Sequence, residues 1–382
     1  MILARRLSRL LVLLPSTAMG GTERHTAELA ARLAARTGLS VSLAAEPTLR
    51  SGLLGAVPTG LAAPRVLGAN LGWDGVAKLG RQSAEARRMI EAEAPDICLL
   101  PLPWPDAGLG IMQALAEARL PRLAILHLVP EGALPQGLDP AAVAAGAPRD
   151  MAWAAVSAPA ARRAEALFGL DPAQIRVVPN AAPPGPSPGT DRAGLRLRVR
   201  AGLGVQEGEG LVVFVGRLER GKGADLLPEL ARRLDATLAV AGDGSLQPAL
   251  AQAAASDPRA RLRLLGSVAD PSALYLAADA LVLPSRMEGA PLVFMEAAAH
   301  RTPVIATAAA LEALGEDAPR MALLVPESDA AALAAALPAL RADPAGTRSR
   351  VEEAEALARR LTWDRATEAW AGLLRAAALR AT

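Results

Sequence analysis

The segment VVFVGRLERGKG, residues Val212 to Gly223, joins an apolar run to two cations that could hold phosphate. An arginine grips a phosphate through two parallel hydrogen bonds, a lysine adds a mobile point charge, and the amides at a helix start favour an anion. Only two of the 41 basic residues are lysines, Lys78 and Lys222. The pattern therefore predicts a diphosphate clamp that uses Arg217 and Lys222.

The same segment also matches most of a P-loop. Gly216, Gly221 and Lys222 have the Walker A spacing, but Gly223 stands where a serine or threonine hydroxyl would hold magnesium. A P-loop NTPase and a plain solvated loop therefore stay open as weaker alternatives to the diphosphate clamp.

Two carboxylates follow in LVLPSRMEGAPLVFMEAAAHRTPVIA, which is read as strand, loop, helix, turn and strand. Glu288 lies in the expected loop, Gly289 allows a tight backbone there, and Pro291 suits the first turn of a helix that carries Glu296 on its second turn. The spacing predicts that both carboxylates face one cleft, with the free amides of the helix start between them. The alternative is a surface loop glutamate and a solvated helix glutamate.

Composition excludes several classes of protein. A length of 382 residues predicts two domains, and 52% hydrophobic with 21% charged residues indicates ordinary globular cores. A formal charge of +2 and 2% aromatic residues argue against a nucleic-acid partner. One cysteine, Cys98, cannot form an internal disulfide, and three histidines (His25, His127, His300) do not suffice for a Cys/His zinc cluster.

The first twenty residues imitate a signal peptide, with Arg5, Arg6 and Arg9 ahead of Leu10 to Leu14. The apolar run is shorter than the 7 to 15 residues of a signal peptide's hydrophobic region, so a buried first strand followed by a glycine turn explains it better. We therefore expect a cytoplasmic protein. A peripheral contact of the three arginines with the inner face of a membrane stays open, although clusters of 4 to 8 are the usual requirement.

Short apolar runs alternate with longer segments of helical period, which predicts an α/β fold with parallel sheets. The expected strands are Leu10 to Leu14, Ser40 to Ala44, Asp96 to Leu100, Leu123 to His127, Ala154 to Val156, Leu211 to Val215, Thr237 to Ala241, Arg261 to Leu265, Ala280 to Leu283 and Val304 to Ala306. The expected helices include Thr22 to Arg36, Leu109 to Glu117 and Ala224 to Leu234.

A proline-rich stretch, Asn180 to Arg192, divides the two halves, because prolines cannot continue a helix or a central strand. We expect an N-terminal domain at 1–185, a linker at 186–195, a C-terminal domain at 196–360 and a final helix at 361–382. Trp370 and Leu374 share a stripe of that helix, which should pack back on the body.

Together these residues resemble a known family. Glu288-x7-Glu296 in PSRMEGAPLVFMEAAA, with GRLERGKG, GDGSLQPAL and LLGSVADPSALYLAADALVLPS, is similar to the retaining nucleotide-sugar glycosyltransferases of family four, most closely from Val212 to Val325. The resemblance implies the GT-B fold, in which two Rossmann-like doubly wound domains face a central cleft. It also implies transfer of a sugar from a nucleoside-diphosphate sugar to a hydroxyl of a glycan, glycolipid or polysaccharide precursor.

The resemblance implies roles for individual residues. Arg217 and Lys222 would bind the donor diphosphate, Glu288 would lie by the donor sugar, and Glu296 would hold the ribose. The N-terminal half fits more loosely, with Gly20 and Gly21 over the diphosphate and His127 near the sugar. The implied catalytic set is Glu288, His127, Arg217 and Lys222, and the donor-binding set is Gly20, Gly21, Arg217, Lys222, Val268, Gly289, Pro291, Leu292 and Glu296.

The implied mechanism is front-face attack, in which the leaving phosphate accepts the acceptor's proton and Glu288 positions the sugar. No cofactor or metal is expected, because Arg217 and Lys222 supply the positive charge. The partners would be a nucleotide-sugar donor and a carbohydrate or lipid-linked acceptor. Sequence alone identifies neither the sugar, the base nor the acceptor.

Two departures from the family pattern keep a second hypothesis open. Arg301 stands where glycine is usual, and Ala308 to Ala310 replace a glycine-rich turn. A non-catalytic relative that still binds sugar nucleotides would fit these changes. A Rossmann-type oxidoreductase ranks last, since no G-x-G-x-x-G follows either first strand.

Overall fold

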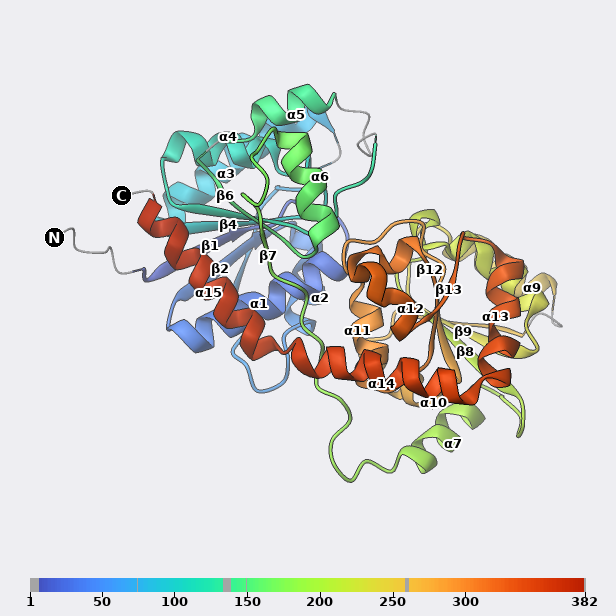
Figure 1. Ribbon diagram of the computed structural model, residues 1–382. Helices are drawn as coiled ribbons and strands as arrows, with labels where there is room; N and C mark the ends of the chain where they lie inside the picture. The colour runs from blue at the N-terminus through green and yellow to red at the C-terminus, as the bar shows by residue number, and fades with distance from the viewer. Residues whose placement is uncertain (1–6, 74, 133–138, 149, 258–260, 381–382) are drawn as a thin grey trace. The chain divides into compact units, whose positions relative to one another are not determined.

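The computed structural model describes residues 7–73, 75–132, 139–148, 150–257 and 261–380. The chain forms two compact units (Figure 1). The first unit holds Met1–Asn180 with Asp364–Thr382, and the second holds Ala181–Trp363. Each unit is described here by itself.

The first unit contains a parallel sheet, which has seven strands within the described residues in the order β3-β2-β1-β4-β5-β6-β7. The strands are β1 (Arg9–Leu13), β2 (Ser40–Ala45), β3 (Arg65–Gly68), β4 (Ile97–Leu102), β5 (Arg122–Leu126), β6 (Ala152–Ala155) and β7 (Arg176–Val177). Strand order reverses between β1 and β4, which is where ligands of open α/β sheets usually bind.

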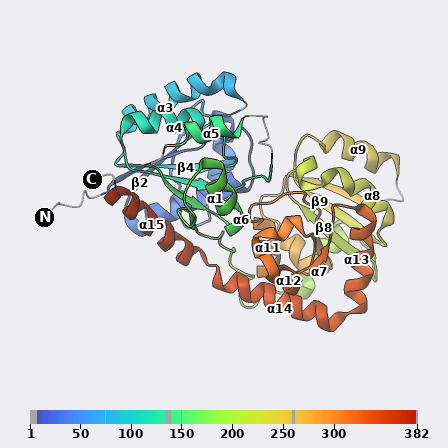
Figure 2. The same cartoon turned by 45° about the horizontal axis from the view of Figure 1, so that its top comes forward.

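Helices connect these strands and cover the sheet (Figures 1 and 2). They are α1 (Gly21–Thr37), α2 (Arg50–Gly55), α3 (Leu79–Glu93), α4 (Leu109–Ala118), α5 (Pro140–Gly146) and α6 (Ala158–Phe168), with short 3-10 turns at Pro47–Leu49 and Val76–Lys78. Strand β1 alternates as its pleat requires. Leu11 and Leu13 join the core formed with α3, α4 and α6, while Leu10 and Val12 are buried on the other face.

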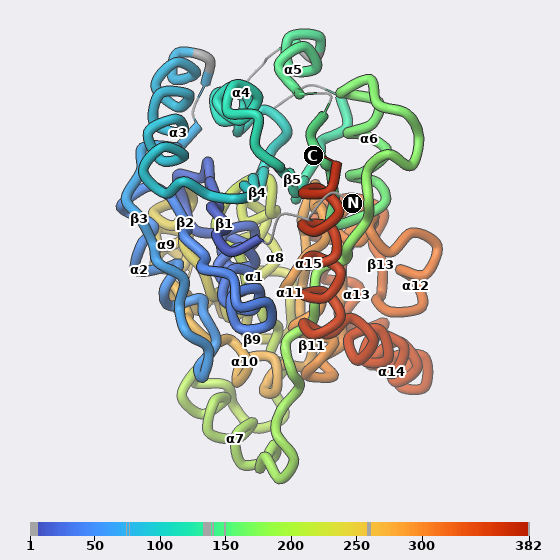
Figure 3. Tube along the Cα trace, turned by 90° about the vertical axis from the view of Figure 1, so that its left-hand side faces the viewer, coloured from blue at the N-terminus to red at the C-terminus, as the bar shows by residue number. Residues whose placement is uncertain are grey.

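The last helix, α15 (Trp363–Arg380), packs on this first unit beside α1, as Figures 1 and 3 show. Trp370 is fully buried, with its ring 6.3 Å from the ring of His25 on α1. Arg36 of α1 donates a 2.8 Å hydrogen bond to Glu368 of α15. The helix therefore packs through the stripe that contains Trp370 and Leu374, as its period predicts.

The second unit contains another parallel sheet, which has six strands among the residues described, in the order β10-β9-β8-β11-β12-β13. The strands are β8 (Gly210–Val215), β9 (Ala236–Ala241), β10 (Leu262–Gly266), β11 (Ala280–Leu283), β12 (Val304–Thr307) and β13 (Leu323–Val325). Here the order reverses between β8 and β11.

Helices cover both faces of the second sheet. They are α7 (Arg192–Gly202), α8 (Leu227–Arg233), α9 (Gln247–Ser256), α10 (Ser272–Ala277), α11 (Leu292–Ala299), α12 (Ala318–Met321), α13 (Ala330–Ala342) and α14 (Pro344–Arg360), with 3-10 turns at Arg220–Lys222, Ala224–Leu226 and Ala309–Asp317. Leu211, Val213 and Val215 of β8 share a core with α10, α11 and α14. Val212 and Phe214 share the opposite core with α8, α9 and α13.

The predicted α/β class, the parallel doubly wound sheets and the expected strands are confirmed, with ends shifted by one or two residues. Strands β3, β7 and β13 were not predicted, because they are short and stand at sheet edges. The helix expected at Ala224 to Leu234 begins instead with a 3-10 turn and becomes α-helical only from Leu227. The linker proposed at 186–195 overlaps α7, and the compact units divide at Asn180 and Asp364.

We expect Trp370→Ala to lower the free energy of unfolding by about 3–5 kcal/mol, because it removes a fully buried ring and leaves a cavity. Leu379→Ala is the matched control, since Leu379 lies on the same helix and is 63% exposed. Denaturant unfolding of both variants measures the difference. Equal stabilities would contradict the packing of α15 on the first unit.

Candidate functional site

The predicted donor-site residues of the second unit gather where strand order reverses. Arg217 and Lys222 follow β8, and Glu288 follows β11, the neighbouring strand on the other side of the reversal. The carboxyl ends of parallel strands meet at one edge of a sheet, so loops that leave them converge. Residues 66 positions apart in sequence are thereby brought into hydrogen-bond contact.

Lys222 and Glu288 form the central ion pair of this site. The ammonium Nζ lies 2.6 Å from both Oε1 and Oε2 of Glu288, and Ser285 donates a further hydrogen bond of 2.8 Å to Oε1. Glu288 is 9% exposed at its side chain and Lys222 is 26% exposed. Because the pair is partly shielded from water, its attraction is stronger than that of a surface pair.

Close backbone packing fixes the loop that carries Lys222. Gly223 has φ of 72°, and a Cβ there would lie 2.2 Å from the carbonyl oxygen of Pro284, the residue after β11. The amide of Arg286 donates to the carbonyl of Gly221 at 2.9 Å. A serine or threonine at position 223 therefore cannot be accommodated without a shift, which argues against the P-loop alternative.

The turn after β9 presses against the start of the same loop. Gly242 has φ of 149°, and its Cβ position would be 1.8 Å from the carbonyl oxygen of Gly216. Leu218 donates to the carbonyl of Asp243 at 2.8 Å, and Leu246 donates to the carbonyl of Leu218 at 2.9 Å. The motif GDGSLQPAL thus supports the loop that holds the cations, a role that only glycine at position 242 permits.

Arg217 lies exposed at the end of β8. Among the residues that the structure describes it forms no ion pair within 4 Å, but Glu219 lies near enough to feel its charge. Ser245 donates to both oxygens of Glu219, at 2.9 Å from its amide and 2.5 Å from its hydroxyl, and this hydrogen bonding lowers the pKa of the Glu219 carboxyl. The Arg217 guanidinium is thus accessible to an anion.

Glu296 lies on α11, half-buried, and its carboxylate has one fixed partner. The hydroxyl of Tyr275 on α10 donates to Oε2 of Glu296 at 2.6 Å. Pro291 is the N-cap of α11 and provides no side-chain cap, so the first amides of the helix, beginning at Leu292, meet no capping side chain. Gly289 lies buried in the preceding loop.

Val268 lies after β10, half-buried against the core that contains Tyr275 and Phe294. It follows Gly266, which has φ of 67°, a conformation that favours glycine. The carbonyl of Gly266 accepts a 2.7 Å hydrogen bond from the amide of Gly242. The segment that carries the predicted donor-binding residue Val268 is therefore tied to the turn that supports the cation loop.

Gly20, Gly21 and His127 belong to the first unit. Gly20 is the N-cap of α1 and Gly21 its first residue, directly after the loop that leaves β1. His127 follows β5, and its amide donates to the carbonyl of Leu102, the last residue of β4, at 3.0 Å. All three therefore lie at the carboxyl edge of the first sheet, near its reversal of strand order.

His127 is buried and packs edge-to-face on His25, with ring centroids 5.1 Å apart. Its Nε2 has no hydrogen-bond partner among the described residues. Burial lowers the pKa of His25 to about 4, and burial together with the charge of His25 lowers the pKa of His127 well below its usual range. Both rings are therefore neutral near pH 7.

The two departures from the family pattern are accommodated in the structure. Arg301 adopts φ of 60°, the conformation that favours glycine, and its guanidinium pairs with Glu355 of α14. The turn at Ala308 to Ala310 is closed by Thr307, whose hydroxyl accepts from the amide of Ala310 at 3.1 Å. Neither change displaces the pairs formed by Glu288 and Glu296.

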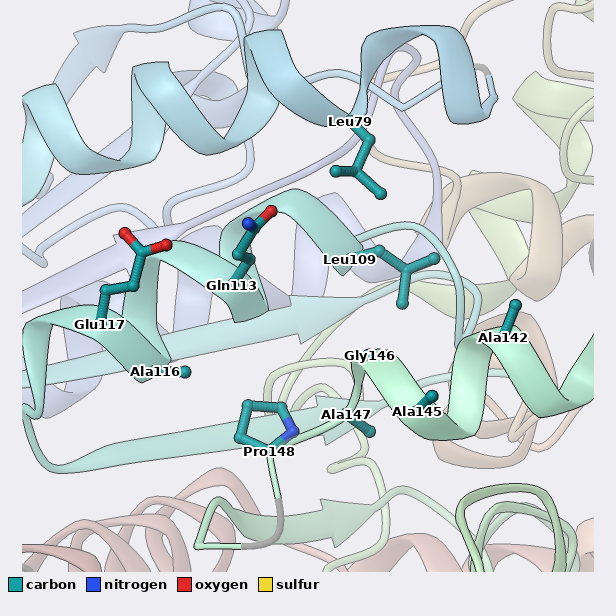
Figure 4. Close-up of a pocket in the computed structure, with 10 residues that line it drawn as sticks. All are labelled: Leu79, Leu109, Gln113, Ala116, Glu117, Ala142, Ala145, Gly146, Ala147 and Pro148. Atoms are coloured by element: carbon teal, nitrogen blue, oxygen red, sulfur yellow. The ribbon is translucent and has the colours of Figure 1, made fainter.

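A hollow of about 370 Å³ lies elsewhere, among α3, α4, α5 and the segment after α5 (Figure 4). Its lining is mostly leucine and alanine, with Gln113 and Glu117 as polar members. Glu117 forms an ion pair with Arg87. None of the predicted site residues lines this hollow, and it offers no cation for a phosphate.

Family models match both halves of the chain. Residues 19–184 match the model described as Glycosyltransferase Family 4, and residues 209–343 match the model described as Glycosyl transferases group 1. The chain belongs to glycosyltransferase family 4. The resemblance found in the sequence is thus confirmed, and it extends to the first half, where the motifs are weaker.

Individual relatives agree with this family. The D-inositol 3-phosphate glycosyltransferase of Mycobacterium tuberculosis H37Rv is 34% identical over 161 residues, which cover 39% of this chain and 32% of that protein. The matched region thus spans about a third of the length of the curated relatives.

Solved structures of similar fold cover nearly the whole chain. The structure of HepE of Anabaena in complex with UDP-glucose has a TM-score of 0.76 at 20% identity and covers 96% of this chain and 99% of that one. A glycosyltransferase from Rickettsia africae has a TM-score of 0.75 at 16% identity, with coverages of 97% and 98%. These similarities confirm the GT-B fold of this family 4 protein.

Three residues at the site were not predicted. Ser285 and Tyr275 hold the two glutamates, and His25 packs on His127. The sequence offered one sign that Tyr275 could have a specific role, since it is the only tyrosine. Arg5 and Arg6, which prompted the suggestion of membrane contact, lie outside the described residues, whereas Arg9 begins β1. Within the described residues, no helix is both long and apolar enough to cross a membrane.

We expect Gly223→Ser to destabilise the family 4 protein by about 2 kcal/mol, because a side chain at positive φ is strained and meets the Pro284 carbonyl. Gly221→Ser is the control, since a Cβ there meets nothing within 4 Å. Thermal unfolding compares the two variants. A stable Gly223→Ser variant that gains magnesium-dependent ATP hydrolysis would instead favour a P-loop.

Stability should fall in acid because of His25. The unfolded chain binds a proton near the ordinary pKa of 6.5, whereas the folded chain binds it only near 4. Stability is therefore complete above about pH 6.5, and His25 alone removes roughly 3 kcal/mol as the pH falls to about 4. Unfolding free energies measured from pH 7 to 4.5 should show a shallower slope for His25→Phe than for the wild type. Equal slopes would contradict the burial of a neutral histidine.

Proposed function

We propose that this chain transfers a glycosyl group from a nucleoside-diphosphate sugar to an acceptor hydroxyl, with retention at the anomeric carbon. The observation that carries this proposal is the Lys222–Glu288 pair. A cation and a carboxylate lie together at the reversal of strand order in a member of glycosyltransferase family 4. The cation can bind the diphosphate, and the carboxylate can orient the sugar that is attached to it.

The chemistry requires positive charge where the leaving group forms. As the bond from the sugar to the diphosphate breaks, negative charge develops on the leaving oxygen, and fixed cations lower the barrier. Lys222 is held in place by Glu288, whose Oε1 also accepts a hydrogen bond from Ser285, and the accessible Arg217 follows the same strand. We assign both cations to the diphosphate.

Glu296 is proposed to accept hydrogen bonds from the ribose. Its half-buried carboxylate lies one turn into α11, whose first amides, together with Gly289, Pro291 and Leu292, would face the donor. Val268 is proposed to lie beside the base, since its segment is tied through Gly266 to the turn that supports the cation loop.

Glu288 is proposed to position the sugar rather than attack it. A carboxylate nucleophile needs a free oxygen beside the anomeric carbon. Both oxygens of Glu288 accept a hydrogen bond from Lys222, and Oε1 also accepts one from Ser285. This arrangement favours front-face attack, in which the leaving phosphate takes the proton of the acceptor hydroxyl. Gly20, Gly21 and His127 stay proposals for further donor contacts.

Uridine is the proposed base, because the related HepE structures contain UDP and UDP-glucose. The proposed acceptor is a carbohydrate or a lipid-linked carbohydrate. The proposed place of action is the cytoplasm, where nucleotide sugars would be available to the enzyme.

The test compares binding and turnover in Lys222→Ala with the wild type. We expect UDP to raise the melting temperature of the wild type without magnesium, because a ligand that binds only the folded state stabilises it. Lys222→Ala should lose this rise, and UDP release from UDP-glucose should slow by about a hundredfold or more. Lys78→Ala, which changes the only other lysine, is the control and should behave like the wild type.

The panel also contains GDP and ADP, the sugar conjugates of these two nucleoside diphosphates, and ATP. Each is tested with and without magnesium. Stabilisation by GDP or ADP in place of UDP would change the base but keep the clamp. Stabilisation by ATP with magnesium alone would overturn the proposal. Binding of UDP that is identical in Lys222→Ala and the wild type would overturn the assignment of the cation.

A further inference from the structure

Tyr275 contacts the carboxylate of Glu296 from the core of the second unit. It lies on α10, is 1% exposed, and its hydroxyl donates to Oε2 of Glu296 at 2.6 Å. A hydrogen bond from a hydroxyl to an ionised carboxylate is short and about twice as strong as one between neutral groups. The ring itself packs in the core of the second unit with Phe294 and Leu274.

The surrounding backbone fixes the relative positions of the two side chains. Thr302, after α11, donates to the carbonyl of Tyr275 at 2.9 Å, which ties the end of α11 to α10. His300 places Nδ1 2.8 Å from the carbonyl of Glu296, and its ring lies 5.7 Å from the ring of Tyr275. The hydroxyl of Tyr275 is thus held in a fixed position, from which it donates a hydrogen bond to the carboxylate of Glu296.

We propose that Tyr275 is a positioning residue for nucleotide recognition: its hydroxyl holds Oε2 of Glu296, so that Oε1 is presented to a ribose hydroxyl of the donor. This inference rests on the proposed function. It adds a specific reason for the tyrosine, because a phenylalanine would fill the same core volume. The hydroxyl, which phenylalanine lacks, is the group that contacts the carboxylate of Glu296.

The physical basis is the freedom of a glutamate side chain. Glu296 is half-buried and has three rotatable bonds, and ordering such a side chain on binding costs free energy. Because the Tyr275 hydroxyl already holds Oε2 of Glu296, part of this free-energy cost is removed before the nucleotide binds. This hydrogen bond also leaves Oε1 with its lone pairs for the ribose, which makes the site selective for a sugar that carries the matching hydroxyl.

The first experiment measures the affinity of Tyr275→Phe and the wild type for UDP, 2′-deoxy-UDP and 3′-deoxy-UDP by calorimetry. The wild type should bind UDP about tenfold or more better than at least one deoxy nucleotide, as expected for a lost hydrogen bond to a charged group. Tyr275→Phe should bind UDP more weakly and lose most of that preference. Its affinity for the less favoured deoxy nucleotide should change little.

Two further variants separate positioning from stability. In a Glu296→Ala background, Tyr275→Phe should have no additional effect on UDP affinity, because the hydroxyl acts through the carboxylate. Thr302→Val is the matched structural control, since it removes a hydrogen bond to the backbone of Tyr275 and leaves the Tyr275 hydroxyl in place. It should lower the melting temperature and keep the preference for ribose.

A spectroscopic measurement follows the hydroxyl directly. Because Tyr275 is the only tyrosine, incorporation of 3-fluorotyrosine gives a single ¹⁹F resonance. Addition of UDP should shift this resonance, since a ribose hydroxyl on Glu296 changes the charge that the tyrosine hydroxyl feels. The shift should be smaller with the less favoured deoxy nucleotide and absent in Glu296→Ala.

The outcomes distinguish this inference from the proposed function. If the wild type binds UDP and Tyr275→Phe keeps both the affinity and the preference for ribose, Tyr275 is only a packing residue and the inference is wrong. Additive effects in the Glu296→Ala background would also overturn it. If the wild type and all variants bind no nucleoside diphosphate of the panel, the proposed function fails, and this inference fails with it.

Discussion

Lys222 reaches Glu288 only because strand order reverses between β8 and β11. The chain continues from β8 to β9 on one side of the reversal and from β11 to β12 on the other, and the two loops begin side by side. Three close backbone contacts support the two loops where they meet. They join Gly223 to the carbonyl of Pro284, Gly242 to Gly216, and the amide of Arg286 to the carbonyl of Gly221. An ammonium and a carboxylate at this point are therefore a product of topology as much as of side-chain choice.

At the carboxyl edge of its sheet, the first unit has a different kind of interaction, the packing of His25 on His127. Where the second unit brings opposite charges together, the first brings two buried, uncharged imidazoles together, with Trp370 close to one of them. Burial keeps the pKa of both histidines low, so these two side chains add no positive charge near pH 7. The positive groups assigned to the diphosphate thus come from one unit.

The sequence predicted the parts of this protein that depend on local pattern. Apolar runs of four to six residues and the glycine, proline and cation positions located the central strands and the loops with Lys222 and Glu288. Edge strands such as β7, with two residues, are too short to have a period. The roles of Tyr275 and Ser285 could not be predicted, because their contacts join segments that only the folded sheet brings together. Arg301 adopts a positive φ of the kind that favours glycine, which sequence could not reveal.

The course of the chain has a consequence for synthesis on the ribosome. The first unit is completed by Asp364–Thr382, after the whole of the second unit has been made. Until that segment emerges, the face of α1 that carries His25 lacks Trp370, and an apolar surface stays open to water or to a chaperone. The second unit, continuous from Ala181 to Trp363, can fold earlier. Synthesis from the N-terminus therefore favours a folding order that differs from the order of synthesis. The second unit completes its core before the first unit does.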